Sequence, residues 1–104
     1  MSDHETKSQA DARLAILGEL AQLRDATANS NHLMPLIDLM GRRRSREWLE
    51  SQLMRLEELG AIRLRRVDLP GLGPVSVATL TSTGRDHVDR RSMLAGVTAP
   101  ADLD

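Results

Sequence analysis

The chain has 104 residues, a formal net charge of −1, one tryptophan, and no phenylalanine, tyrosine or cysteine. This length predicts one domain with a modest aliphatic core, and the lack of cysteine excludes disulfides and thiolate chemistry. No apolar run approaches the roughly 18 residues of a membrane span, and the N-terminus lacks the pattern of a signal peptide, so we expect a cytoplasmic protein.

The first predicted element is a helix from about residue 8 to residue 25, preceded by a flexible N-terminus at residues 1–7. Its apolar stripe is wider than packing on one small domain usually needs. The helix therefore either helps to form a homodimer or lies across the core of its own domain. The apolar residues form two adjoining rows, Leu14, Leu17, Ala21 and Ile16, Leu20, Leu23.

A short helix over residues 32–40 is predicted after a loop at residues 27–31. Proline is accepted in the first turn of a helix and disfavoured deeper in it, so the regular part should start close to Pro35. Gly41 closes the helix, and the arginines at 42–44 form a turn. The apolar residues follow the i, i+3, i+4, i+7 spacing of one helix face: Leu33, Leu36, Ile37 and Met40.

The clearest element is a helix over residues 45–59. Ser45 suits the N-cap, because its hydroxyl oxygen can accept a hydrogen bond from an unpaired N–H of the first turn. Gly60 suits the left-handed position that ends many helices. Between these ends, Leu49, Leu53 and Leu56 share one face. The helices over 32–40 and 45–59 therefore form a predicted helix-turn-helix pair.

After Gly60 the period of the pattern changes to that of a strand. Ile62 and Leu64 alternate with arginines, and a second alternating run covers residues 75–80. Prolines and glycines crowd residues 70–74 and interrupt any regular element. Two strands around such a loop predict an antiparallel hairpin whose tip, near residues 69–73, forms a wing.

A last helix is predicted from a cap at Thr81 or Ser82 to about Leu94. Residues 95–104 have no periodicity and end acidic, so we expect a flexible C-terminal tail. The domain therefore spans residues 8–94. Its predicted class is α+β, a mainly helical winged helix-turn-helix with one β-hairpin wing.

Two stretches, SREWLESQLMRLEELGAI and LTSTGRDHV, resemble winged-helix transcription regulators of the ArsR and MarR types. Over roughly residues 12–98 the chain also looks like the small ArsR-like proteins of Mu-like bacteriophages, which share its AIL-x-x-L helix, its VATLT strand and a Gly-Val pair, here Gly96 and Val97. The residues that match the regulator pattern are Ser45, Leu49, Leu53, Leu56, Gly60, Leu80, Thr81 and Gly84.

This resemblance implies a phage or prophage transcriptional regulator that forms a homodimer through its first and last helices. It also implies the second helix of the pair in the major groove and the wing on the DNA backbone. ArsR-type sensors often bind metal through cysteines. This chain has none, so metal sensing is not implied.

Positive charge is concentrated in one part of the chain. Residues 42–66 hold eight arginines and four glutamates, whereas the remainder holds six basic and eleven acidic residues. We therefore predict double-stranded DNA as a partner, contacted by phosphate-binding arginines and by exposed positions of the helix over 45–59. The candidate residues are Arg42, Arg43, Arg44, Ser45, Arg46, Glu47, Glu50, Ser51, Arg55, Arg63 and Arg65.

The same pattern leaves other interpretations open. Mixed arginine and glutamate also cover ordinary solvated helices through i,i+4 pairs such as Arg46 and Glu50. Trp48 either covers the edge of the core or anchors a partner. An acidic total charge also fits a protein-interaction or assembly module of a phage that does not bind DNA.

Catalysis needs a nucleophile or an acid–base pair held in one pocket, and no such constellation is visible. The three histidines are isolated from one another: His4, His32 and His87. An aspartate next to His87 does not complete a set of metal ligands. We predict no enzymatic activity, no metal and no cofactor.

Overall fold

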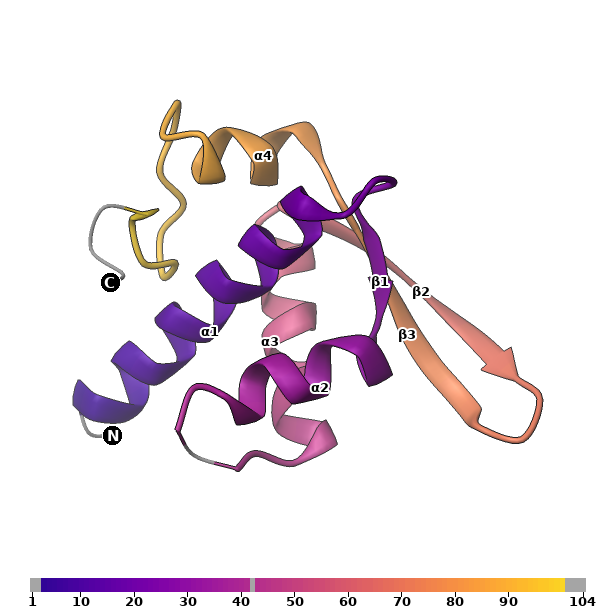
Figure 1. Ribbon diagram of the computed structural model, residues 1–104. Helices are drawn as coiled ribbons and strands as arrows, with labels where there is room; N and C mark the ends of the chain where they lie inside the picture. Colours follow the sequence, from indigo (N-terminus) through magenta and orange to yellow (C-terminus); the bar gives the residue numbers. More distant parts are fainter. Residues whose placement is uncertain (1–2, 42, 101–104) are drawn as a thin grey trace.

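The computed structural model describes residues 3–41 and 43–100, which form four helices and a three-stranded antiparallel sheet (Figure 1). The predicted α+β class is confirmed, and the order of the elements matches winged-helix topology. No helix in the described ranges is long and apolar enough to cross a membrane. The elements are α1 Asp3–Gln22, β1 Thr27–Asn29, α2 Ser30–Asp38, α3 Arg46–Glu58, β2 Ile62–Leu69, β3 Gly73–Leu80 and α4 Ser82–Val88.

The sheet has the order β1-β3-β2, so its central strand is the second strand of the hairpin. Strand β1 lies where a loop was expected, which is a correction. It pairs with β3 from Thr27 opposite Thr79 to Asn29 opposite Val77. Three residues are too few to show an alternating pattern. The strand exists because β3 supplies its hydrogen-bonding partners.

Helix α1 begins at Asp3, earlier than predicted, and it ends at Gln22. The side chain of Glu5 in its first turns contacts Arg44 and Trp48, so the start of the helix is held against α3. Residues 1–2 of the expected flexible N-terminus lie outside the described residues. The wide apolar stripe is buried within the chain, and it packs against α2, α3, α4 and β3. This burial agrees with the interpretation that the helix lies across its own core.

The helix-turn-helix pair consists of α2 and α3. Helix α2 starts at Ser30, before the predicted start near Pro35, because the Asn29 side chain caps it by accepting from the His32 N–H at 3.0 Å. Pro35 lies inside the helix on its exposed side. Helix α3 agrees with prediction at both ends. The Ser45 hydroxyl accepts from the Trp48 N–H, and Gly60 has a φ of 78°.

The hairpin of β2 and β3 reaches away from the helices (Figure 1). Its tip follows the prediction: Leu69 pairs with Gly73, and the Leu72 N–H donates to the Leu69 carbonyl at 3.0 Å. Gly71 and Gly73 have φ values of 79° and 78°, which glycine adopts without strain. The tip is therefore a defined turn that leaves Leu72 exposed.

Helix α4 ends at Val88 and not near Leu94 as predicted. Arg90 follows with a φ of 65°, which stops the helix. The chain then turns back beside α1, where the Thr98 N–H donates to the Ala10 carbonyl at 3.2 Å and Val97 is buried (Figure 1). The segment expected to be a flexible tail is thus packed as far as residue 100. Residues 101–104 lie outside the described ranges.

Arg13 connects this C-terminal segment to α1 and α3. Its Nη1 donates to the Gly96 carbonyl at 3.0 Å, and its Nε donates to Gln52 Oε1 at 2.9 Å. Burial, with a smaller contribution from the nearby Arg55, lowers the pKa of Arg13. Gly96 and Val97, the Gly-Val pair of the sequence pattern, therefore help to hold the C-terminal segment against α1.

Candidate nucleic-acid interface

A chain of polar contacts joins the N-terminal ends of α2 and α3 to the hairpin, and we call it the junction network. Ser30 is fully buried, and its Oγ accepts from Arg46 Nη1 at 3.1 Å and from the Ser76 N–H at 3.3 Å. Ser76 Oγ donates to Glu50 Oε1 at 2.6 Å, and Arg66 Nη2 lies 3.9 Å from the same oxygen. The network sets the orientation of α3 relative to the hairpin and brings Arg46 and Arg66 to its edge.

Arg66 is a candidate that the sequence reasoning missed. It occupies the same face of β2 as Ile62 and Leu64, and it pairs with Ser76 across the hairpin. Its side chain is 68% exposed. Strand alternation from Ile62 predicts this face for Arg66, but not its proximity to Glu50 of α3.

Arg63 and Arg65, two of the predicted phosphate contacts, point to the opposite face of the sheet. Their cross-strand partners are Thr79 and Val77. Side chains alternate between the two faces of a strand, so Arg63 and Arg65 lie on the face opposite to Leu64, which packs against the core. The structure therefore does not bring Arg63 and Arg65 together with α3.

The exposed face of α3 differs in one respect from expectation. Glu50 was predicted to point away from the protein, but its side chain is only 17% exposed because its carboxylate is bound in the junction network. The i,i+4 ion pair between Arg46 and Glu50 is not among the ion pairs of the described residues. Arg46 instead donates to Ser30 and to the Asn31 side chain.

The outermost row of α3 is not basic. It consists of Glu47, Ser51, Met54 and Glu58, all exposed. Arg55, on the flank of this row, pairs with Glu58 at 3.2 Å. The Ser51 hydroxyl donates to the Trp48 carbonyl at 2.7 Å. Apart from Arg55, which is paired with Glu58, the cationic groups on this side lie at the N-terminal end of α3 and on β2.

The arginines of the turn before α3 have different environments. Arg42 lies outside the described residues. Arg43 is exposed. Arg44 is only 16% exposed, because its guanidinium stacks 4.4 Å from the Trp48 ring centroid and pairs with Glu5 Oε1 at 3.2 Å. Arg44 therefore holds α1 against α3, and Arg43 is the described arginine of the turn that remains at the surface.

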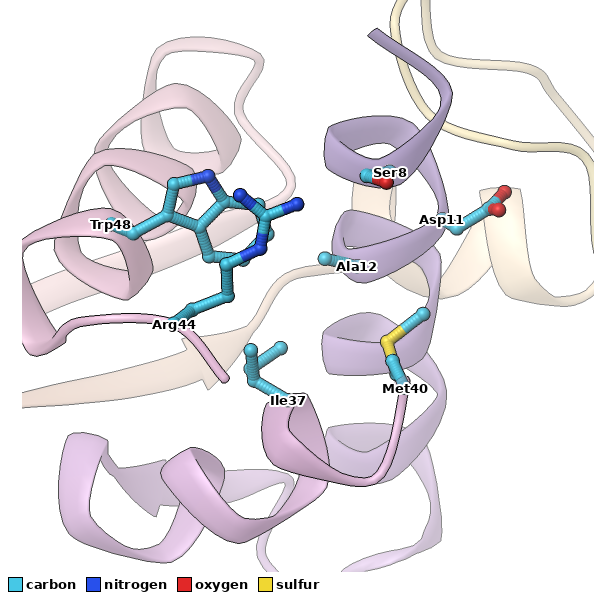
Figure 2. A pocket seen from close by; sticks show the side chains of 7 residues that line it. All are labelled: Ser8, Asp11, Ala12, Ile37, Met40, Arg44 and Trp48. Atoms are coloured by element: carbon cyan, nitrogen blue, oxygen red, sulfur yellow. The ribbon is translucent and has the colours of Figure 1, made fainter. Parts of the chain in front are cut away.

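Trp48 lies beside a small pocket of about 80 Å³ between α1 and the end of α2 (Figure 2). Its ring packs at the edge of the core, and its Nε1 donates to Glu5 Oε2 at 3.1 Å. These contacts agree with the interpretation of Trp48 as a cover of the core edge. The pocket is lined by Ser8, Asp11, Ala12, Ile37, Met40, Arg44 and Trp48.

Hydrogen bonds around Glu5 change its acidity. Hydrogen bonds from Gln9 and Trp48, with a further contribution from Arg44, lower the pKa of Glu5 below its ordinary value, although partial desolvation acts in the opposite direction. The carboxylate therefore stays ionised to lower pH than an isolated glutamate does.

His87 is buried and serves the fold. Its Nδ1 accepts from the Leu94 N–H at 3.0 Å, and its Nε2 lies 2.9 Å from the Thr98 carbonyl oxygen. Both ring nitrogens are therefore occupied by the backbone of the C-terminal segment. Within residues 3–41 and 43–100, no group of three or more His, Cys, Asp or Glu side chains is arranged to hold a metal ion.

The structure thus brings Arg46 and Glu50 together with the unpredicted Arg66, and it keeps Arg43 at the nearby surface. Arg44 and Ser45 are used in packing and capping. Comparison with protein-family models and with curated proteins gave no match to this chain.

Proposed function

We propose that the protein binds double-stranded DNA and regulates transcription, with α3 in the major groove and the hairpin on the backbone. The observation that carries this proposal is the placement of Arg46 and Arg66 at the edge of the junction network. Their guanidinium groups flank the N-terminal half of α3, the part of a recognition helix that contacts base edges.

The proposed contacts are of two kinds. Arg43, Arg46 and Arg66 contact phosphates, which positions the protein without reading sequence. Glu47 and Ser51 are exposed on α3 and can meet base edges, where glutamate accepts from cytosine. The carboxylates of Glu47 and Glu58 oppose phosphate approach, so we expect modest affinity. With three phosphate contacts, the slope of log K against log salt should be about −3.

Three further parts of the proposal rest on the resemblance to ArsR-like phage proteins. The protein acts as a phage or prophage regulator, it is located in the cytoplasm, and it forms a homodimer through its first and last helices. The apolar rows of α1 are buried in the chain's own core, so a dimer would use the exposed residues of α1 and α4.

The test is titration of labelled duplex DNA with the purified protein, read by anisotropy at several salt concentrations. The double variant R46A/R66A should bind about tenfold or more weakly and should reduce the salt slope by about two. The matched control R63A/R65A removes the same charge from the opposite face of the sheet and should bind as the unchanged protein does.

Two outcomes would contradict the proposal. One is the absence of binding at low salt, and the other is an equal loss in both double variants. Because Arg46 also contacts Ser30, the single variant R66A provides a check that does not touch this buried hydroxyl. Its exposed side chain makes one contact of 3.9 Å.

A second candidate function is a protein-interaction or assembly module. It is favoured by two exposed apolar side chains, Met54 on α3 and Leu72 at the hairpin tip, which are 58% and 65% exposed. Met54 shares the outer row of α3 with Glu47 and Glu58, and such a row suits a protein surface better than a phosphate backbone. Binding through these residues would respond little to salt, and M54A/L72A would weaken it.

A further inference from the structure

The outer face of the sheet, turned away from the core, carries several cross-strand rows of side chains, which include Val67 opposite Val75 toward the hairpin tip. The strand register places Thr27, Thr79 and Arg63 in one row and Asn29, Val77 and Arg65 in the next. Around β2 and β3 this face forms a shallow hollow of about 310 Å³. Its lining consists of Arg63, Leu64, Arg65, Val77 and Thr79.

The two arginines of this face have no counter-charge in the described part of the chain. Both are exposed, and neither forms an ion pair or a side-chain hydrogen bond with residues 3–41 or 43–100. The two rows contain no acidic residue. The Arg44 and Arg66 guanidinium groups, in contrast, each lie beside a carboxylate. The fold therefore leaves two adjacent positive charges available to an external anion.

The edge of β2 is a less suitable place for a partner than this face. The Leu64 N–H, which an added strand would need, donates to Glu57 Oε2 at 3.1 Å. Charged side chains on an edge strand also oppose strand addition. A partner that uses Arg63 and Arg65 would therefore lie across the face and not along the edge.

We propose that this face binds an extended acidic segment of a partner protein, with carboxylates on alternate residues. Alternate residues of an extended chain are about 6.6 Å apart, which is the spacing of Arg63 and Arg65 along β2. Each guanidinium can then pair with one carboxylate. Val77, half-buried in the row of Arg65, contacts an apolar side chain of the segment. The Thr79 hydroxyl, which is hydrogen-bonded to the Thr27 hydroxyl at 3.0 Å, borders this contact.

The chemistry of the face favours a peptide over a duplex. Two cations around an apolar centre suit a short segment of mixed charge and apolar character. A duplex would present many phosphates to only two arginines and would gain nothing from Val77. The face is opposite to the row of Arg66, so this interaction does not depend on the proposed DNA binding.

The experiment is an NMR titration of the full chain, labelled with ¹⁵N, at low salt. The probe is a synthetic peptide with aspartate and valine on alternate positions, and its control has asparagine in place of each aspartate. Backbone amide shifts should be confined to the residues of the outer face, and the asparagine peptide should leave them unchanged. R63Q/R65Q should weaken binding about tenfold, whereas R46Q/R66Q should not affect it.

Three results would overturn the proposal: shifts that map elsewhere, equal binding of the asparagine peptide, or shifts of these amides by a DNA duplex and not by the acidic peptide. The proposed DNA binding is judged separately, because it concerns the amides around Ser30, Arg46 and Ser76. Either proposal can therefore fail without the other.

Discussion

Ser30 and Ser76 are 46 residues apart in the chain, and the Ser76 N–H donates to Ser30 Oγ at 3.3 Å. Both residues are buried. This hydrogen bond joins the start of the helix-turn-helix pair to the central strand of the sheet. Because Ser30 Oγ also accepts from Arg46, one hydroxyl connects α2, α3 and β3.

Ser30→Ala should therefore destabilise the protein. The substitution leaves the Ser76 N–H without its Oγ acceptor in a buried position, which costs about 1–3 kcal/mol. Urea denaturation followed by circular dichroism measures the loss. Ser92→Ala, at an exposed position, should change the free energy of unfolding by less than about 0.5 kcal/mol. Equal midpoints for both variants would show that the hydrogen bond does not contribute.

Gly84→Ala should destabilise by about 1–3 kcal/mol or more through overpacking. A Cβ at Gly84 would lie 2.3 Å from the Ala61 carbonyl oxygen and 2.7 Å from Leu80 Cδ1. The backbone of α4 therefore approaches Ala61, the residue before β2, at a distance that only glycine permits, which gives a physical reason for glycine in the L-T-x-x-G pattern.

The matched control for this substitution is Gly18→Ala in α1. Its Cβ would meet no atom within 4 Å, and alanine is the better helix former, so we expect a gain of up to about 1 kcal/mol. Thermal unfolding should thus shift in opposite directions for the two variants. A loss of similar size in both would contradict the packing argument.

Acid should loosen the contact between α1 and α3 at Glu5. The pKa of Glu5 is lower in the folded protein, so its ionised form contributes stability at neutral pH. That contribution decreases as the pH falls below the ordinary glutamate pKa, and it is lost once the pH passes the lowered value. Trp48 is the single tryptophan and donates to this carboxylate, so its fluorescence reports the change.

The control for the acid titration is Glu5→Gln, which should remove the fluorescence transition assigned to this group. A transition of the same midpoint and size in Glu5→Gln would assign it to another carboxylate. A midpoint above the ordinary glutamate pKa would contradict the direction of the shift.

The hydrogen bonds of His87 specify the tautomer that carries its proton on Nε2. The Thr98 carbonyl can only accept a hydrogen bond, and the Leu94 N–H can only donate one, so the two contacts specify this tautomer. Nitrogen NMR of the imidazole ring at neutral pH should show protonated Nε2 and unprotonated Nδ1. The opposite tautomer would contradict the hydrogen bonding described here.

His87→Ala should release the C-terminal segment while the rest of the domain stays folded. Amide hydrogen exchange of Leu94, Val97 and Thr98 should become much faster, because the ring that holds this segment is removed. Protection of β3 should persist. Unchanged protection at Thr98 would show that its bond to the Ala10 carbonyl is sufficient to hold the segment.

The sequence by itself determined the parts of this protein that depend on neighbouring residues. The cap at Ser45 and the left-handed glycine at Gly60 define the ends of α3, because capping is a local interaction between residues two to four apart. The turn at residues 69–73 follows from glycine and proline chemistry in the same way. The concentration of arginine before and after α3 is likewise visible in the sequence alone.

Only the tertiary structure decided which of these arginines lie together. Arg63 and Arg65 are close to α3 in the sequence, yet the sheet turns them away from it and leaves Arg66 beside Glu50. Strand β1 and the packed segment up to residue 100 depend on partners far along the chain, β3 and α1. Such elements form because distant groups satisfy their hydrogen bonds and bury their side chains. A local sequence pattern cannot predict a partner that is far along the chain.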